Sequence, residues 1–359
     1  MGTRTENGPR SVDLAHRPEH LLKSVIDVPT SSQAFFVPKD RMRTSSLGTL
    51  DCLPLELQHD CLSKLDLRSL ARLSRVSCHG EAVVVSLHQL QVLTEHADNI
   101  FATLTRTKVI HRHSVARLHA ALTSENCISC GQYGPYLRLL TAERCCYLCL
   151  LLNPSLQLIS IHKAKECFAL TNRQTAKLVT MWSIPGRYAD PRGGVGPGAL
   201  RRRSLRLVGV DAAKALALKA HKSLNALEKK HPLVYENYST EQHFEALRRY
   251  RQAPLGPLAL DSPLLRPFPC GPGEHFGGLG VVPFPSFSGG HIEHGLWCRQ
   301  CDVAVVDMMC NGLRPEALAQ LAPPGCDGLK RVFLLKYRAW SASGLLEHER
   351  QCHCPPDLA

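Results

Sequence analysis

The chain lacks any segment that resembles a membrane-targeting or membrane-spanning element. Residues 1–20 are polar and contain no apolar core of the kind found in secretory signals, so we expect no cleaved signal peptide. No run of about 18 uninterrupted apolar residues occurs, so we predict no transmembrane helix. We therefore expect the chain in a reducing compartment, the cytoplasm or the nucleus, where paired cysteines are more often metal ligands than disulfides.

Recognisable catalytic signatures are also missing. The sequence has no Gly-rich phosphate loop, no G-x-S-x-G turn and no pair of carboxylates within a recognisable motif. His291-Ile292-Glu293 resembles half of a zinc deaminase signature, but it stands too close to the following C-x2-C pair. The stretch that begins at His348-Glu349 has Cys352 where a metalloprotease motif has its second histidine. We predict a protein without a catalytic residue.

Aromatic residues make up only 6% of the chain, and they do not interleave with its basic residues. The formal charge is +12, from 43 Lys and Arg against 31 Asp and Glu, and residues 201–251 hold 12 basic and 5 acidic residues. Two amphipathic helices are expected there, over 211–231 and 240–251. A basic face on them can bind nucleic acid, which is our alternative function, but such runs are more typical of solvated helices, so we do not expect nucleic acid as a partner.

Residues 48–122 are rich in leucine at helical spacing and contain no glycine between Gly48 and Gly80. Pro54 suits the first turn of a helix, and Glu56 complements the positive end of its dipole. Asp66 is placed to cap a second helix. Short helices with apolar stripes must pack on each other or on a partner.

The order of these residues resembles the F-box. The match follows the pattern L-P-x-E-L, C-L, L-D, S-L-x-x-L-S-x-V-S, at Leu53, Pro54, Glu56, Leu57, Cys61, Leu62, Leu65, Asp66, Ser69, Leu70, Leu73, Ser74, Val76 and Ser77. The sequence departs from the family after Val76, because many F-boxes continue with a tryptophan and residues 77–81 contain none.

The resemblance implies a three-helix module that docks the Skp adaptor of a cullin–RING ubiquitin ligase. Part of the leucine stripe would then stay exposed until the adaptor covers it. The protein would be a substrate receptor for an unknown protein target. On periodicity alone, the leucines can equally fill an internal core. The residues that we expect to contact the adaptor are Leu53, Pro54, Glu56, Leu57, Leu62, Leu65, Leu70, Leu73 and Val76.

A first cysteine cluster has the spacing of a structural zinc site. Cys127, Cys130, Cys146 and Cys149 form C-x2-C-x15-C-x2-C, with a short strand predicted between the pairs. Four thiolates complete a tetrahedral shell, so we expect a structural ion and no catalysis. Cys145 can replace Cys146 as a ligand, and unligated buried cysteines are the alternative.

The arrangement is also similar to F-box proteins of filamentous fungi that carry a cysteine-rich region after the F-box. In those proteins a C-x2-C pair precedes R-C-C-x2-C and then a basic stretch with a late phenylalanine. The matching residues here are Cys127 and Cys130, the run from Arg144 to Cys149, and the run from His162 to Phe168.

A second cluster lies near the end of the chain. Its expected zinc ligands are Cys298, Cys301, His348 and Cys352, and the last two stand at i and i+4 on one helical turn. His294, His353 and Cys354 are rival ligands, and unligated cysteines are again the alternative.

The predicted fold is mainly α with small zinc-stapled β hairpins (α+β), a three-helix F-box being followed by cysteine-rich modules. We expect a disordered tail over 1–47 and an F-box-like helical domain over 48–90. Residues 91–190 should hold a helical linker and the first cysteine module. Residues 191–290 should hold basic helices and a Pro/Gly-rich loop, and 291–359 the second Cys/His module.

Overall fold

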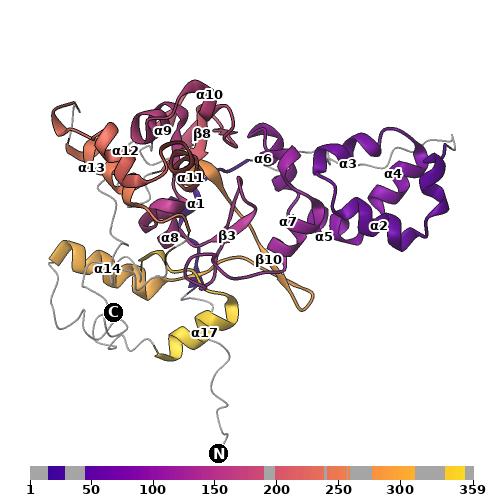
Figure 1. The fold of residues 1–359 in the computed structure, drawn as a ribbon. Coiled ribbons are helices and arrows are strands. Elements are labelled where there is room, and N and C mark those ends of the chain that lie inside the picture. Colours follow the sequence, from indigo (N-terminus) through magenta and orange to yellow (C-terminus); the bar gives the residue numbers. More distant parts are fainter. Residues whose placement is uncertain are drawn as a thin grey trace, which may run out of the picture.

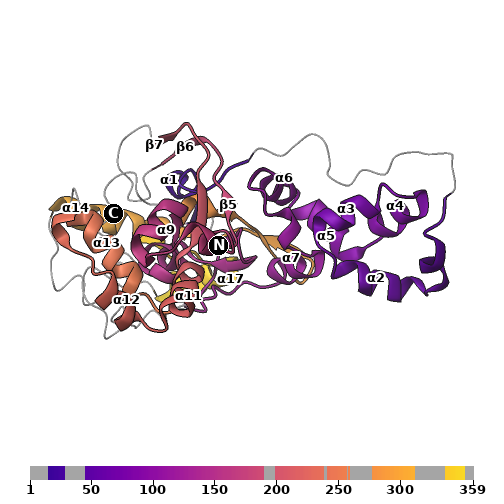
Figure 2. The ribbon, with the colours of Figure 1, turned by 45° about the horizontal axis from the view of Figure 1, so that its top comes forward.

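The computed structural model describes residues 15–28, 45–189, 199–237, 241–256, 258, 277–311 and 336–351. These residues form a mainly helical chain with several short strands. Figure 1 shows an arm of helices, in purple, that extends from a mixed α/β body, and Figure 2 shows the same arm after rotation. Among the described helices, none is both long and apolar enough to cross a bilayer.

The arm consists of short helices with buried leucine and valine faces. Asp66 caps the second of them as predicted, because its carboxylate accepts a hydrogen bond from the Ser69 amide at 3.0 Å. Ser77 and Ser114 cap later helices in the same way. The elements are η2 (Gly48–Cys52), α2 (Leu55–Ser63), α3 (Leu67–Leu73), α4 (Cys78–Val85), α5 (His88–His96), α6 (Asn99–Arg106), η3 (Ile110–Arg112) and α7 (Val115–Leu122).

The first cysteine region forms a small antiparallel sheet followed by helix α8 (Tyr147–Leu152). The predicted strand exists as β2 (Tyr136–Arg138), which pairs with β3 (Glu143–Cys145). The other edge of β2 pairs with β9 (Val281–Pro283), which follows the short turn η6 (Gly277–Gly280). Residues from two predicted segments, 91–190 and 191–290, therefore share one sheet, and the predicted segment boundaries stay a prediction.

A second three-stranded sheet lies in the body and has the order β4-β8-β5. Helices α9, α11 and α13 bury their apolar residues in one cluster beside it. The elements of this part are η4 (Pro154–Leu156), β4 (Leu158–Ser160), α9 (Ile161–Phe168), α10 (Asn172–Thr175), β5 (Met181–Trp182), β6 (Gly186–Tyr188), β7 (Ala199–Arg201), β8 (Arg206–Gly209), α11 (Val210–His221), α12 (Leu224–Lys230), η5 (Tyr235–Asn237) and α13 (Glu241–Gln252).

The prediction of one continuous helix over 211–231 is wrong. Lys222 has a positive φ of 70°, which ends α11, and the Ser223 hydroxyl accepts a hydrogen bond from the Ala226 amide to start α12. The serine thus competes with helix continuation by capping a new one. The second predicted helix, over 240–251, is confirmed as α13.

Part of the expected disordered tail is ordered. Residues 15–28 contain β1 (Ala15–His16) and α1 (Glu19–Leu22), and β1 pairs with β12 (Trp297–Cys298). Leu21, Val25 and Ile26 are buried, and the Ile26 amide donates a hydrogen bond to the Val281 carbonyl at 3.1 Å. Burial of these apolar residues offsets the entropic cost of ordering the segment. The sequence did not indicate this, because the tail as a whole has a polar composition. Residues 1–14 and 29–44 lie outside the described residues.

The last part of the chain begins with strands inside the predicted Pro/Gly-rich loop. After β9, strands β10 (Ser286–Ser288) and β11 (His291–Glu293) form a hairpin whose turn residues, Gly289 and Gly290, both have positive φ. A two-residue turn of this kind strongly favours glycine. Within the described residues that follow, the helices are α14 (Arg299–Asn311) and α17 (Ala342–Gln351).

Several contacts join the arm to the body, among them a hydrogen bond from the Trp182 amide to the Thr107 carbonyl at 3.0 Å. The ring of His96, at the end of α5, stacks on Phe287 of the β10–β11 hairpin with centroids 5.1 Å apart. The buried Arg144 guanidinium donates hydrogen bonds to the carbonyls of Ala121 on α7 and of Phe284, each at 2.9 Å. It also donates to the carbonyls of Gly134 and Pro285. One buried side chain therefore connects α7, the cysteine hairpin and the strand region after β9.

Candidate functional site

The distal part of the arm exposes an unusual number of large apolar side chains. Leu57 is 52% exposed and Val76 73% exposed, and Leu53, Pro54, Glu56 and Leu65 are exposed as well. Leu50 and Leu55 belong to the same exposed set, although neither is part of the F-box pattern described from the sequence. Large apolar side chains gathered on one short segment are typical of an interaction surface. We call this set the arm face: Leu50, Leu53, Pro54, Leu55, Glu56, Leu57, Leu65 and Val76.

Three residues predicted to contact a partner lie elsewhere. Leu62 is 7% exposed and Leu70 is fully buried, both in the core of the arm. Leu73 is half-buried and packs against that core. The prediction that Leu62 and Leu70 form part of the docking surface is therefore corrected, because their side chains hold the helices together.

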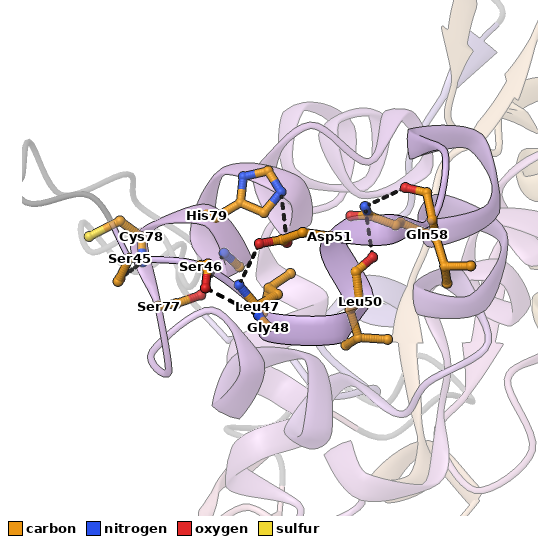
Figure 3. Close-up of polar contacts among 12 residues, drawn as sticks. Ser45, Ser46, Leu47, Gly48, Leu50, Asp51, Gln58, Ser77, Cys78 and His79 are labelled. Carbon is orange, nitrogen blue, oxygen red and sulfur yellow. Dashed lines mark hydrogen bonds and ion pairs between the residues drawn. The ribbon is translucent and has the colours of Figure 1, made fainter.

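A hydrogen-bond network of Ser45, Leu47, Asp51, Cys78 and His79 fixes the start of the arm to the N-terminus of α4 (Figure 3). The Cys78 amide donates to the Ser45 hydroxyl at 2.8 Å, and the His79 amide donates to the Ser45 carbonyl at 3.1 Å. Asp51 accepts a hydrogen bond from the Leu47 amide and lies 3.3 Å from the His79 ring. Ser45 thus satisfies amides that the first turn of a helix leaves free.

Residues 77–81, which depart from the family pattern, pack closely against the residues of this network. A Cβ atom added to Gly80 would lie 2.9 Å from the Leu47 side chain and 3.0 Å from the Leu73 carbonyl oxygen. The glycine lets Leu47 approach α4, so this chain covers α4 with its own preceding segment.

The two cysteine pairs of the first cluster meet, as their spacing predicted. The sulfur atoms of Cys127, Cys130, Cys146 and Cys149 all lie within 4.8 Å of one another, and those of Cys130 and Cys146 are 3.7 Å apart. Zinc–sulfur bonds of about 2.3 Å in a tetrahedron place sulfur atoms about 3.8 Å apart. Gly131, with φ of 70°, makes the turn after the first pair. The four residues fit a zinc ion.

The thiols in this cluster differ in their acidity. Hydrogen bonds from the other three thiols, first that of Cys130, lower the pKa of Cys127 below its usual range. Cys145 lies outside the cluster, and burial raises the pKa of its thiol. Of the two neighbouring cysteines that the sequence left open, the structure brings Cys146 to the cluster.

The second cluster contains three of its four predicted ligands. Cys298 at the end of β12, Cys301 in the first turn of α14 and His348 on α17 have ligand atoms within 4.8 Å of one another. The Nε2 atom of His348 lies 3.2 Å from the Cys301 sulfur. His294 is exposed and is not part of this group. Cys352, His353 and Cys354 lie outside the described residues.

Some of the basic residues between 201 and 251 have structural roles. Lys214 is buried and its ammonium donates to the Ala253 carbonyl. Arg251 is buried as well, and its guanidinium donates to the carbonyls of Cys167 and His231 at 2.6 and 2.8 Å. These two cations are therefore not available to an external partner.

Comparison with known proteins agrees with the arm geometry. The family model described as "F-box domain" matches residues 50–79, which include the whole of α2 and α3. No curated protein and no solved structure matches the chain. The chain therefore carries an F-box domain, and such a domain implies binding of a Skp adaptor within a cullin-based ubiquitin ligase.

Proposed function

We propose that the protein is a substrate receptor whose arm face docks the Skp adaptor and whose body binds a protein target. The observation that supports this most directly is the exposure of apolar side chains within the matched F-box segment. Leu57 and Val76 keep half or more of their surface in water in the free chain, and its transfer to an adaptor groove would be favourable.

The body would supply target recognition without chemistry of its own. F-box proteins are generally non-catalytic receptors. The mechanism would be proximity, because a target held near a ubiquitin-charged enzyme reacts at a raised effective concentration. The Arg144 bonds and the contact between His96 and Phe287 would keep the body at a fixed position relative to the adaptor.

Structural zinc would hold the body together at both cysteine clusters. In the first cluster four thiols already converge, and zinc would replace their protons. In the second cluster Cys298, Cys301 and His348 would bind the ion, with Cys352 as the proposed fourth ligand. An ion with four protein ligands keeps no open position, so its role would be structural.

A pull-down of the purified full chain with the Skp adaptor tests the proposal. The double variant Leu53→Ala with Pro54→Ala should lose the adaptor while keeping its helical circular dichroism. Leu200→Ala, which removes an exposed leucine on β7, is the control and should bind like the wild type. Equal binding by the double variant and the control would overturn docking through the arm face.

A further inference from the structure

Residues 336–340 run from one cysteine cluster to the other. Tyr337 is buried, and its ring lies 5.6 Å from that of Tyr147, the residue next to Cys146. Two backbone hydrogen bonds join Trp340 to Leu296, at 2.8 and 3.0 Å, just before β12. The two ends of this short segment, which we call the bridge segment, are therefore fixed at different clusters.

The packing between the clusters leaves no space at Gly295. A Cβ atom added there would lie 2.7 Å from the Pro135 side chain, 3.3 Å from the Tyr133 ring and 3.4 Å from Ala339. The loop before the second cluster, the hairpin of the first cluster and the bridge segment thus meet in direct contact. A shift of one cluster would be transmitted to the other through packed atoms.

Arg338 stands in the middle of the bridge segment. Its guanidinium carbon lies 3.6 Å from the centre of the Trp340 ring, and Trp340 in turn stacks on His348 with centroids 4.5 Å apart. Burial lowers the pKa of the Arg338 guanidinium, and Cys130, Cys146 and Cys301 oppose this shift, so cysteines of both clusters lie in its surroundings. Its Nε atom is buried and has no hydrogen-bond partner within the described part of the chain.

A positive charge at this place meets a specific electrostatic need. Four thiolates around one divalent ion carry more negative than positive charge, and uncompensated charge in partly buried surroundings is costly. Arginine remains protonated, and its N–H groups can donate hydrogen bonds to metal-bound sulfur. Two neighbouring arginines are engaged elsewhere, Arg144 with four backbone carbonyls and Arg138 with Glu143 at 3.2 Å.

We propose that Arg338 is a positioning residue that serves both cysteine clusters as a shared counter-charge, so that their metal binding is coupled. The inference rests on the metal binding proposed above and is independent of adaptor docking. Loss of the ion at one cluster would release the bridge segment and weaken the other cluster. The body would therefore gain or lose its two ions as one unit.

The test uses the zinc-loaded full chain and measures zinc per chain by mass spectrometry and zinc release to a chromophoric chelator. R338M should release zinc about tenfold faster from both clusters, as expected when a group supporting metal ligands is removed. R338K keeps the charge but loses the planar contact with Trp340, so its release rate should lie between those of R338M and wild type. R248M removes an exposed arginine on α13 and should match the wild type.

A ligand variant separates coupling from a local effect. C301S should lose the ion of the second cluster and also release the remaining ion faster than the wild type does. Unchanged release from R338M and R338K, or an unchanged first cluster in C301S, would overturn the coupling. A wild-type chain that binds no zinc would overturn both the metal proposal and the coupling, while adaptor binding measured on the same samples would report separately on the proposed function.

Discussion

The sulfur of Cys146 lies 3.7 Å from that of Cys130, whereas Cys145, the adjacent residue, is buried opposite Tyr136 in the β2–β3 hairpin. Successive side chains along a strand point to opposite faces. The chain at and just after the end of β3 therefore directs Cys146 to the four-cysteine cluster and Cys145 to the opposite side.

The two cysteines should respond differently to substitution. Cys146→Ser should lose zinc from the first cluster, because a hydroxyl is a poor replacement for a thiolate ligand. Cys145→Ala should retain it and lose only a small apolar contact, about 1 kcal/mol in the free energy of unfolding. Zinc per chain, measured on both purified variants, checks the assignment, and zinc retained by Cys146→Ser but lost by Cys145→Ala would reverse it.

The Asp66 cap offers a matched pair for stability measurements. Asp66→Ala should lower the free energy of unfolding of the arm by about 1 kcal/mol, because the Ser69 amide loses its acceptor. Asp60→Ala removes only an exposed ion pair with Lys64 and should cost less than about 0.5 kcal/mol. Urea denaturation followed by far-ultraviolet circular dichroism gives both values, and equal costs would show that the cap contributes nothing specific.

Arg144 should be among the residues most sensitive to substitution. Arg144→Met leaves buried carbonyls of Ala121, Phe284 and Pro285 without their donor and should destabilise the fold by more than about 3 kcal/mol. Arg117→Met, an exposed change on α7, should remain within about 0.5 kcal/mol of the wild type. Thermal unfolding of the two variants compares them directly, and similar melting temperatures would mean that Arg144 does not join arm and body.

His113 should make stability depend on pH. Burial lowers the pKa of its imidazole to about 4, from 6.5 for the ordinary group, and its Nε2 atom lies 2.7 Å from the Leu139 carbonyl oxygen. In the unfolded chain the His113 imidazole becomes protonated below about pH 6.5, whereas in the folded chain it becomes protonated only below about pH 4. The contribution of His113 to the free energy of unfolding is therefore complete above pH 6.5 and decreases as the pH falls from 6.5 to 4. The loss attributable to His113 is at most about 3 kcal/mol.

The measurement is urea unfolding of wild type and His113→Gln at several values between pH 7.5 and pH 4. The wild type should lose more stability than the variant over this range, because glutamine does not titrate. Parallel curves would contradict a neutral, buried His113.

The sequence predicted those features that depend on local spacing. The order of residues from Leu53 to Val76, the cap at Asp66 and the convergence of Cys127, Cys130 and Cys149 all follow from positions within a few turns or a single hairpin. Which of Cys145 and Cys146 joins the cluster depends on the phase of β3, which the spacing alone left open.

Pairing between strands that are far apart in the chain could not be predicted from the sequence. Strand β9 has three residues, one of them Pro283, and only its partner β2 makes it a strand. In the same way, the ordered structure of residues 15–28 depends on their contacts with Val281 and β12. Likewise, the burial of Leu62 and Leu70 could not be separated from the exposure of Leu57, because one periodic stripe contains core and surface leucines alike.

The most direct test of the central proposal is the affinity of the full chain for the purified Skp adaptor, measured by calorimetry with a matched pair of variants. Leu57→Asp places a charge on the arm face, and Leu200→Asp places the same charge at an equally exposed leucine on β7. We predict that Leu57→Asp weakens binding at least about a hundredfold, the scale of a lost interface anchor, while Leu200→Asp leaves it unchanged. Binding that is equal in the two variants, or absent from the folded wild-type chain, would contradict it.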